Sequence, residues 1–355
     1  MQDQASHFVS VTSGRTWELE MSATMQTPYE VVRRAIDFEG PERLPMRFDA
    51  CGVNDTYSVH YEPPAASPLD RSLGARRALD EWGCGWVKSE VQNMGRVGGH
   101  PLADWKAMDS YRFPDPCAED RWATMEHQLA GAGDRYVVIG NGFTVWERAF
   151  YLHGYEAMLA DFYLTPDRVH ELLDRILDFH LGICKVIGWR FRGRIHGMGM
   201  TDDWGTQTAS TISVPLWREF FKPRYKSLYD AIHEAGMHAW MHSCGKVTDI
   251  VGEWIDVGLD VVNLQQPTLL GIEEMGERYR GRICFETVVD IQKTLPSGTR
   301  QEIEVQAVQL IQEWSTPEGG FILSDYGDGA AIGVPDERKW WMFEAFKRND
   351  PWART

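Results

Sequence analysis

Short apolar segments alternate with longer amphipathic segments along almost the whole chain, and this alternation constrains the fold more than any other feature. The run RYVVIGNGF is typical of a buried strand, and the later segment TPDRVHELLDRILDFHLGICKVIGW has the length and period of a helix. The same order recurs through MHAWMHS, VTDIVGEWIDVG and DVVNLQQ. Strands and helices that alternate in this way form parallel βαβ units.

Repetition of these units through one chain predicts an α/β fold with a single (β/α)8 barrel. A doubly wound parallel sheet is the alternative, but no glycine-rich phosphate loop follows the first expected strand, in RLPMRFDACG. Residues 1–25 are poorly patterned and are expected to form an N-terminal arm, and residues 26–355 are expected to form the barrel. The segment SLGARRALDEWG is expected to be a helix.

The formal net charge of −16 argues against some kinds of partner. An acidic chain repels the phosphate backbone, so nucleic-acid binding is not expected. The sequence contains no run of about 18 apolar residues that would predict a membrane span, and its beginning lacks the pattern of a secretory signal. Six cysteines scattered over 355 residues are typical of reduced thiols, which indicates a cytoplasmic protein.

Polar residues follow most of the expected strands. In a (β/α)8 barrel the catalytic groups lie where strands end and loops begin, so these residues are expected to meet around one mouth. They are Arg47, Asp49, Asn141, Asp202, Asp203, His242, Cys244, Gln265, Gln266, Glu286, Asp325 and Asp328. So many polar side chains in one place predict a binding site.

The motif His242-x-Cys244 is the strongest chemical signal at this mouth. Residues two apart on a strand point to the same side, and an imidazole with a thiolate suits Zn²⁺, which takes nitrogen and sulfur ligands. Further ligands are expected from later strand ends, where Glu286 and Asp328 offer carboxylates, with Asp325 nearby. The alternative is a buried thiol that packs as a small apolar group beside a hydrogen-bonded histidine.

A second polar cluster lies in the segment TDDWGTQT. We predict that Asp203 and Gln207 contact the substrate as catalytic residues and that Trp204 forms a wall of the substrate site. The alternative is that the Asp and Thr residues of this segment cap the next helix.

Arg47 and Asp49 point to the same side of an early strand. Arg47 is predicted to bind substrate and Asp49 to act in catalysis; alternatively, the two close the barrel mouth as an ion pair. Asn141, Gln266 and Asp325 complete the predicted substrate-binding residues.

The segments DDWGTQT, REFFKPRYKSLYDAIHEAG, HSCGKVTDIVGEWIDVGLDVVN and DIQKTLPSGTRQEI together resemble the uroporphyrinogen decarboxylase superfamily, and the resemblance extends over nearly the whole chain. It implies a (β/α)8 barrel. The nearest branch looks like the methyltransferases that serve corrinoid-dependent methyl transfer. In that branch zinc is held by a His-x-Cys pair, matched by His242 and Cys244, and by a later cysteine. In the corresponding region this chain has Asp325 and Asp328.

The decarboxylase branch binds a tetrapyrrole polycarboxylate through an arginine-rich segment near the N-terminus. The matching segment, RLPMRFDACGVNDTYSVHYEPP, contains Arg47 but lacks the family's second arginine and its Gly-Arg-Tyr context. This difference argues against uroporphyrinogen as the substrate.

We therefore predict a zinc-dependent methyltransferase that moves a methyl group between a small O- or N-methyl substrate, or a thiol, and a separate corrinoid (cobalamin) protein. A partner is needed because the chain has no Asp-x-His-x-x-Gly corrinoid motif. Metal-independent decarboxylation of a carboxylated substrate by Arg47, Asp49 and Asp203 is the alternative, and a non-catalytic binding barrel is a third. The resemblance also makes a homodimer plausible.

Overall fold

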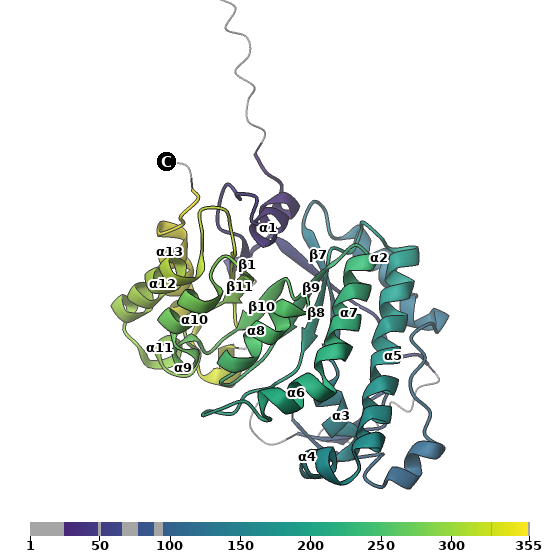
Figure 1. The fold of residues 1–355 in the computed structure, drawn as a ribbon. Helices are drawn as coiled ribbons and strands as arrows, with labels where there is room; N and C mark the ends of the chain where they lie inside the picture. The colour runs from purple at the N-terminus through teal and green to yellow at the C-terminus, as the bar shows by residue number, and fades with distance from the viewer. Residues whose placement is uncertain (1–24, 49–50, 66–76, 89–94, 328, 354–355) are drawn as a thin grey trace, which may run out of the picture.

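A computed structural model describes residues 25–48, 51–65, 77–88, 95–327 and 329–353 (Figure 1). The strands are β1 (Met46–Phe48), β2 (Val53–Asn54), β3 (Thr56–His60), β4 (Arg77–Leu79), β5 (Gly85–Val87), β6 (Arg96–Gly99), β7 (Tyr136–Phe143), β8 (Gly197–Thr201), β9 (His238–His242), β10 (Val261–Leu264), β11 (Cys284–Thr287) and β12 (Phe321–Ser324).

The α-helices are α1 (Pro28–Ile36), α2 (Met125–Ala130), α3 (Trp146–His153), α4 (Tyr155–Leu164), α5 (Pro166–Arg190), α6 (Val214–Phe220), α7 (Lys222–Glu234), α8 (Thr248–Asp256), α9 (Pro267–Leu270), α10 (Ile272–Tyr279), α11 (Thr294–Ser297), α12 (Arg300–Trp314) and α13 (Asp336–Arg348). Short 3-10 helices lie at Trp105–Asp109, Glu119–Trp122 and Gly329–Ile332.

The central sheet has nine strands in the order β2-β1-β12-β11-β10-β9-β8-β7-β3. All neighbouring strands are parallel except β2, which runs antiparallel to β1. The eight parallel strands form the wall of a barrel, and Figure 1 shows helices such as α5, α7, α10 and α12 around them. The predicted (β/α)8 barrel is therefore confirmed.

Local sequence explains where several helices begin. Thr27 accepts a hydrogen bond from the Glu30 amide, and the Glu30 carboxylate accepts one from the Thr27 amide, which forms a capping box at the start of α1. Pro28 follows in the first turn, where its missing N–H has no helical partner to lose. Thr299 and Glu302 form the same arrangement at α12.

Between β3 and β7 the chain forms a small antiparallel sheet in the order β4-β5-β6. The prediction of a helix in SLGARRALDEWG is wrong for its described part, because Arg77–Leu79 form β4. Ala78 pairs there with Trp86 of β5. Pairing with a neighbouring strand thus outweighs the helix propensity of alanine and leucine. Residues 72–76 of this segment lie outside the described residues.

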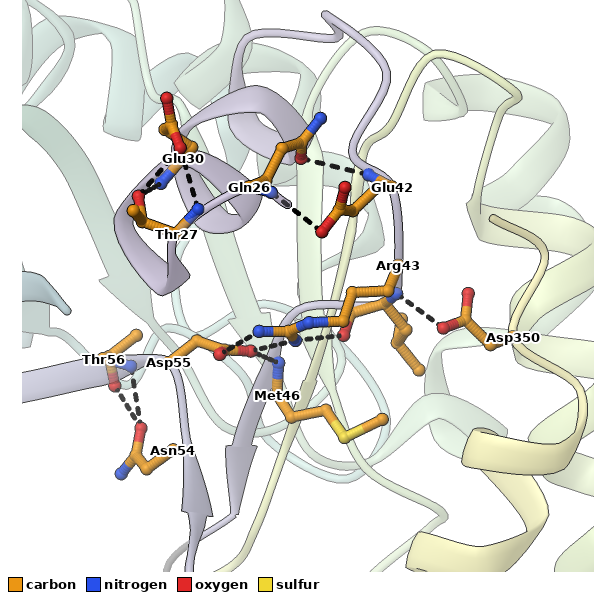
Figure 2. A network of polar contacts seen from close by, with 11 residues as sticks. Gln26, Thr27, Glu30, Glu42, Arg43, Met46, Asn54, Asp55, Thr56 and Asp350 are labelled. Carbon is orange, nitrogen blue, oxygen red and sulfur yellow. Dashed lines mark hydrogen bonds and ion pairs between the residues drawn. The ribbon is translucent and has the colours of Figure 1, made fainter. Parts of the chain in front are cut away.

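Asp55 joins the two ends of the barrel sheet, where β3 approaches β1 (Figure 2). Its carboxylate accepts hydrogen bonds from both terminal nitrogens of Arg43, at 2.7 and 2.6 Å, and from the Met46 amide at 2.8 Å. Its own amide donates to the Met46 carbonyl, and its carbonyl accepts from the Tyr136 amide of β7. One carboxylate, 5% exposed, therefore links β1 to the opposite end of the sheet.

All six cysteines are free thiols, as the sequence led us to expect. Among the described helices, none combines the length and the apolar character that crossing a membrane requires. Residues 1–24 of the predicted N-terminal arm lie outside the described residues, so the division between arm and barrel stays a prediction.

We expect Asp55→Ala to lower the free energy of unfolding by about 1–3 kcal/mol, because the Arg43 guanidinium and the Met46 amide lose their buried acceptor. Urea unfolding followed by circular dichroism measures the change. Asp109→Ala is the matched control, because Asp109 is 72% exposed and lies 3.7 Å from Arg168, and it should shift stability by less than about 0.5 kcal/mol. Equal effects of the two substitutions would contradict a special role for Asp55.

Candidate active site

A cavity of about 950 Å³ lies at the carboxyl ends of the barrel strands, and we call it the mouth cavity. Side chains from β1 and from β7 to β12, or from the residues that follow these strands, contribute to its wall. Its polar residues include Arg47, His60, Glu147, Thr201, Asp203, His242, Cys244, Asn263, Gln265, Glu286 and Asp325. Many of the residues that the sequence placed at strand ends thus share one cavity.

Three side chains that can bind a metal ion meet in this wall. Asp203, His242 and Cys244 each offer one ligand atom, and these atoms lie within 4.8 Å of one another. Nε2 of His242 is 3.3 Å from Sγ of Cys244 and 3.8 Å from a carboxylate oxygen of Asp203. The three residues come from the ends of β8 and β9, which are adjacent strands. Within the described part of the chain, no other three such residues come this close.

Asn263, on β10, fixes the orientation of His242. Its side-chain oxygen lies 2.6 Å from Nδ1 of the imidazole. Because an amide oxygen can only accept, Nδ1 carries the proton, and Nε2 presents its lone pair toward Cys244 and Asp203. Histidines that bind metals are commonly held by such a second hydrogen bond.

Hydrogen bonds and a close backbone contact join the loops that carry Asp203 and Cys244. The Cys244 amide donates to the Asp203 carboxylate at 2.8 Å, and the Gly205 amide donates to the Cys244 carbonyl at 3.1 Å. A Cβ at Gly245 would lie 2.2 Å from the Gly205 backbone, and the φ of Gly245 is +81°, so this close approach requires glycine. Gln266 accepts from the Gly245 amide at 2.6 Å and thereby holds the same loop.

Negative charge collects around the Cys244 thiol. Burial, and then the charges of Asp203 and Glu147, raise the pKa of this thiol to about 12. The thiol therefore keeps its proton at neutral pH unless a cation displaces it, and metal binding to cysteine releases a proton in this way.

Glu147, in the first turn of α3, adds another carboxyl group to the mouth cavity. It accepts hydrogen bonds from the Tyr151 hydroxyl at 2.9 Å and the Thr201 hydroxyl at 3.3 Å. Burial, and then the charges of Asp203 and Asp202, raise its pKa to about 8. Glu147 is therefore mainly protonated at neutral pH and has a proton to donate.

Asp202 supports the site from behind the cavity. Its buried carboxylate accepts hydrogen bonds from the amides of Val145, Trp146 and Glu147 at 2.7–3.2 Å, and from the Tyr225 hydroxyl. The start of a helix favours a negative charge, so this contact binds α3 to the end of β8. The position of Glu147 relative to the metal-binding group consequently depends on Asp202.

Two ion pairs involve other predicted site residues. A guanidinium nitrogen of Arg47 lies 3.2 Å from the carboxylate of Glu286, which is 2% exposed. Glu286, predicted as a metal ligand, is thus bound by an arginine and is not part of the close group with His242 and Cys244. Asp325 lies 3.2 Å from Nζ of Lys339.

The remaining predicted residues are spread over several places. Trp204 is fully buried behind the cavity, where it stacks on Trp146 with ring centroids 5.2 Å apart. Gln207 is exposed in the loop after β8. Asn141 faces a separate pocket next to the mouth cavity.

Asp49, predicted to be catalytic, and Asp328, predicted to bind the metal, lie outside the described residues. The structure also brings in two residues that sequence reasoning did not select, Glu147 and Asn263. Asn263 had a detectable signal, because an amide inside the apolar strand DVVNLQQ needs a polar partner. Glu147 had none, because an acidic residue in a first helical turn is ordinary.

A sequence profile for the family described as Uroporphyrinogen decarboxylase (URO-D) matches residues 94–348. The chain belongs to the uroporphyrinogen decarboxylase family. The matched region contains Glu147, Asn263 and all three residues of the metal-binding group, and it confirms the superfamily predicted from the sequence. No match was found among curated proteins.

Solved structures resemble this member of the uroporphyrinogen decarboxylase family. A methyltransferase from Methanosarcina mazei is 16% identical, and the alignment covers 75% of this chain and 76% of that chain with a TM-score of 0.59. A D-psicose 3-epimerase, crystallised in the presence of D-fructose, is 13% identical over 64% of this chain and 84% of that chain, with a TM-score of 0.38. The likeness to the methyltransferase shows a common fold.

The raised pKa of Glu147 predicts how the stability of the zinc-free protein depends on pH. The native carboxyl keeps a proton that the unfolded chain loses above about pH 4.5, so its contribution to stability is lost as the pH rises through about 8. Glu147→Gln cannot lose this proton. Relative to wild type, the variant should therefore gain on the order of 4 kcal/mol between about pH 5 and about pH 9.

Urea titrations with a zinc chelator present, at both pH values, measure this gain. Glu156→Gln is the control, because Glu156 is an exposed carboxylate on the nearby helix α4, and its pH dependence should follow the wild type. A Glu147→Gln curve that runs parallel to the wild type would show that Glu147 has an ordinary pKa.

Proposed function

We propose that this protein is a zinc-dependent methyltransferase that moves a methyl group between a small O- or N-methyl substrate, or a thiol, and a separate corrinoid protein. The observation that carries the proposal is the meeting of Asp203, His242 and Cys244 in the wall of the mouth cavity. A decarboxylase that works without metal needs no such ligand group. The fold shared with a methyltransferase agrees with this proposal.

The donor atoms of the three residues fit zinc, which binds imidazole nitrogen, thiolate sulfur and carboxylate oxygen. Catalytic zinc sites have three protein ligands and keep a fourth position for a water or substrate. Asn263 holds the His242 ring with Nε2 toward the other two ligands, so binding needs no new ring orientation. In this proposal Asp203 takes the place first predicted for Glu286, and Asp328 remains a predicted further ligand.

Bound zinc would polarise the oxygen, nitrogen or sulfur atom of the substrate. The protonated carboxyl of Glu147 would give its proton to that atom as the bond to the methyl carbon breaks and the bonding electrons stay on the heteroatom. Tyr151 and Thr201 would hold the carboxylate that remains until it regains a proton from water. A cation at the metal-binding group lowers the pKa of Glu147, which makes its proton easier to release.

The corrinoid would supply or accept the methyl group. The mouth cavity, at about 950 Å³, lies in the upper part of the range for small-molecule sites. This volume leaves room for a small substrate beside the metal-binding group, and the cavity mouth is where a partner protein would present its corrinoid.

In the alternative function, Arg47 binds a carboxylated substrate that is then decarboxylated. Arg47 is paired with Glu286 at 3.2 Å, and decarboxylation at this pair would leave the group of Asp203, His242 and Cys244 without a role. We therefore favour methyl transfer.

Asp203→Ala is expected to weaken zinc binding at least about 100-fold, because one of three protein ligands is lost. Glu286→Gln, the matched control in the same cavity, should change the affinity less than about 3-fold, because Glu286 binds Arg47 in our proposal. Competition with a chromogenic zinc chelator measures both affinities. If Glu286→Gln lost zinc while Asp203→Ala kept it, the ligand would be Glu286.

The zinc-loaded protein is expected to form methylcobalamin from reduced cobalamin and members of a panel of O-, N- and S-methyl compounds, which the corrinoid absorbance spectrum reports. Cys244→Ala should slow this reaction at least about 100-fold, whereas Cys117→Ala, which removes an exposed thiol, should not. Release of CO₂ from carboxylated compounds at the same rate before and after zinc removal would instead support the decarboxylase.

A further inference from the structure

A second cavity of about 380 Å³ lies next to the mouth cavity, and we call it the side pocket. Its lining includes Tyr61, Trp82, Asn141, Arg148 and Phe179. Four further lining residues, His60, Gly140, Gly142 and Phe143, also line the mouth cavity. The two cavities therefore share a wall at the end of β3 and β7, and a ligand of moderate size can contact both.

An irregularity in β7 places the polar side chain of Asn141 in the wall of the side pocket. The register with β8 shifts between Gly140 and Gly142, so Asn141 is the extra residue of a bulge. Its amide contacts the Tyr61 hydroxyl at 2.8 Å and Nδ1 of His180 at 2.9 Å. The bulge explains why Asn141 faces the side pocket and not the mouth cavity, where the sequence had placed it.

Arg148 brings a guanidinium group into this pocket. Its Nη1 donates to Asp80 at 2.8 Å, and its plane lies over the rings of Trp82 and Phe143, with centroids 4.8 and 5.6 Å away. The side chain is 9% exposed, and its Nε has no hydrogen-bond partner among the described residues. Arg148 thus presents a largely buried positive charge to the wall of the side pocket, where a ligand anion can pair with it.

The charges around Arg148 favour a ligand with a single negative charge. Asp80 already accepts from the Trp82 and Cys84 amides and the Trp86 indole, besides Arg148. Its charge is therefore shared among several donors, and Arg148 can attract a further anion.

The other ionisable groups of the side pocket leave this preference intact. Glu81 is paired with the buried Arg121 at 2.6 Å, and burial lowers the pKa of His180 to about 3, so this ring is neutral. The carboxylates of Asp80 and Glu81 would repel a doubly charged phosphate, which leaves a carboxylate as the fitting group. The side pocket is also lined by aromatic rings, which suit a flat ligand; they belong to Tyr61, Trp82, Phe143 and Phe179.

Consecutive residues of α3 connect this pocket with the proposed chemistry. Glu147 lines the mouth cavity, and Arg148, the next residue, lines the side pocket. Both are positioned by the hydrogen bonds that Asp202 accepts from the start of α3. A substrate bound to Arg148 would therefore lie at a fixed distance from Glu147.

We propose that the side pocket binds the carboxylate end of a flat, ring-containing substrate through Arg148, and that the opposite end of this substrate extends into the mouth cavity. That the opposite end carries the transferred methyl group rests on the proposed function; the binding of the carboxylate does not. The substrate class is then an aromatic carboxylate with a methyl ether or methylamine group.

Isothermal titration of the full-length, zinc-free protein with para-methoxybenzoate and with neutral para-methoxybenzyl alcohol tests this binding. We expect the acid to bind at least about 10-fold more tightly than the alcohol, as a buried arginine–carboxylate contact requires. Arg148→Met should abolish this preference. Arg175→Met should keep it, because Arg175 is an exposed arginine on α5 that lies over Phe113.

His60→Trp provides a second test that does not alter a buried side chain. His60 is exposed and lines both cavities, so an indole there should narrow the passage and weaken binding of the acid at least about 10-fold. Equal affinity for acid and alcohol in the wild type, or an unchanged preference in a folded Arg148→Met protein, would overturn the proposal. Binding of the acid without any methyl transfer would instead reject the proposed function and leave the side pocket standing.

Discussion

The buried carboxylate of Asp202 is the contact on which the candidate site depends. It follows β8, and it accepts hydrogen bonds from three successive amides at the start of α3 and from Tyr225. The next residue, Asp203, belongs to the metal-binding group. Helix α3, whose first amides donate to Asp202, carries Glu147 and Arg148. A single carboxylate thus sets the metal-binding group, the proposed proton donor and the side pocket relative to one another.

The two sides of the mouth cavity differ in how their charged side chains interact. Near β1 and β12 they are paired, as Arg47 with Glu286 and Asp325 with Lys339. Near β8 and β9, burial, and then the charges of Asp203 and Glu147, raise the pKa of the Cys244 thiol. A bound cation would relieve this repulsion, so we infer that the electrostatics and the ligand geometry favour the same place for zinc.

Strand and helix periodicity was enough to predict the barrel, because parallel βαβ units leave few other arrangements. It also predicted that His242 and Cys244 lie together at the mouth of the barrel. It could not select Asp203 over Glu286 as their neighbour, because that choice depends on which strands are adjacent and on the salt bridge to Arg47. The sequence also could not predict that Asn141 lines the side pocket, because a one-residue bulge does not change the apolar pattern of β7.

X-ray absorption at the zinc edge of the metal-loaded protein tests the central claim, that Asp203, His242 and Cys244 hold the metal, most directly. We expect one sulfur neighbour at about 2.3 Å and nitrogen or oxygen neighbours at about 2.0–2.2 Å, with the sulfur signal lost in Cys244→Ala. A zinc ion with no sulfur neighbour, or with two, would contradict this ligand group.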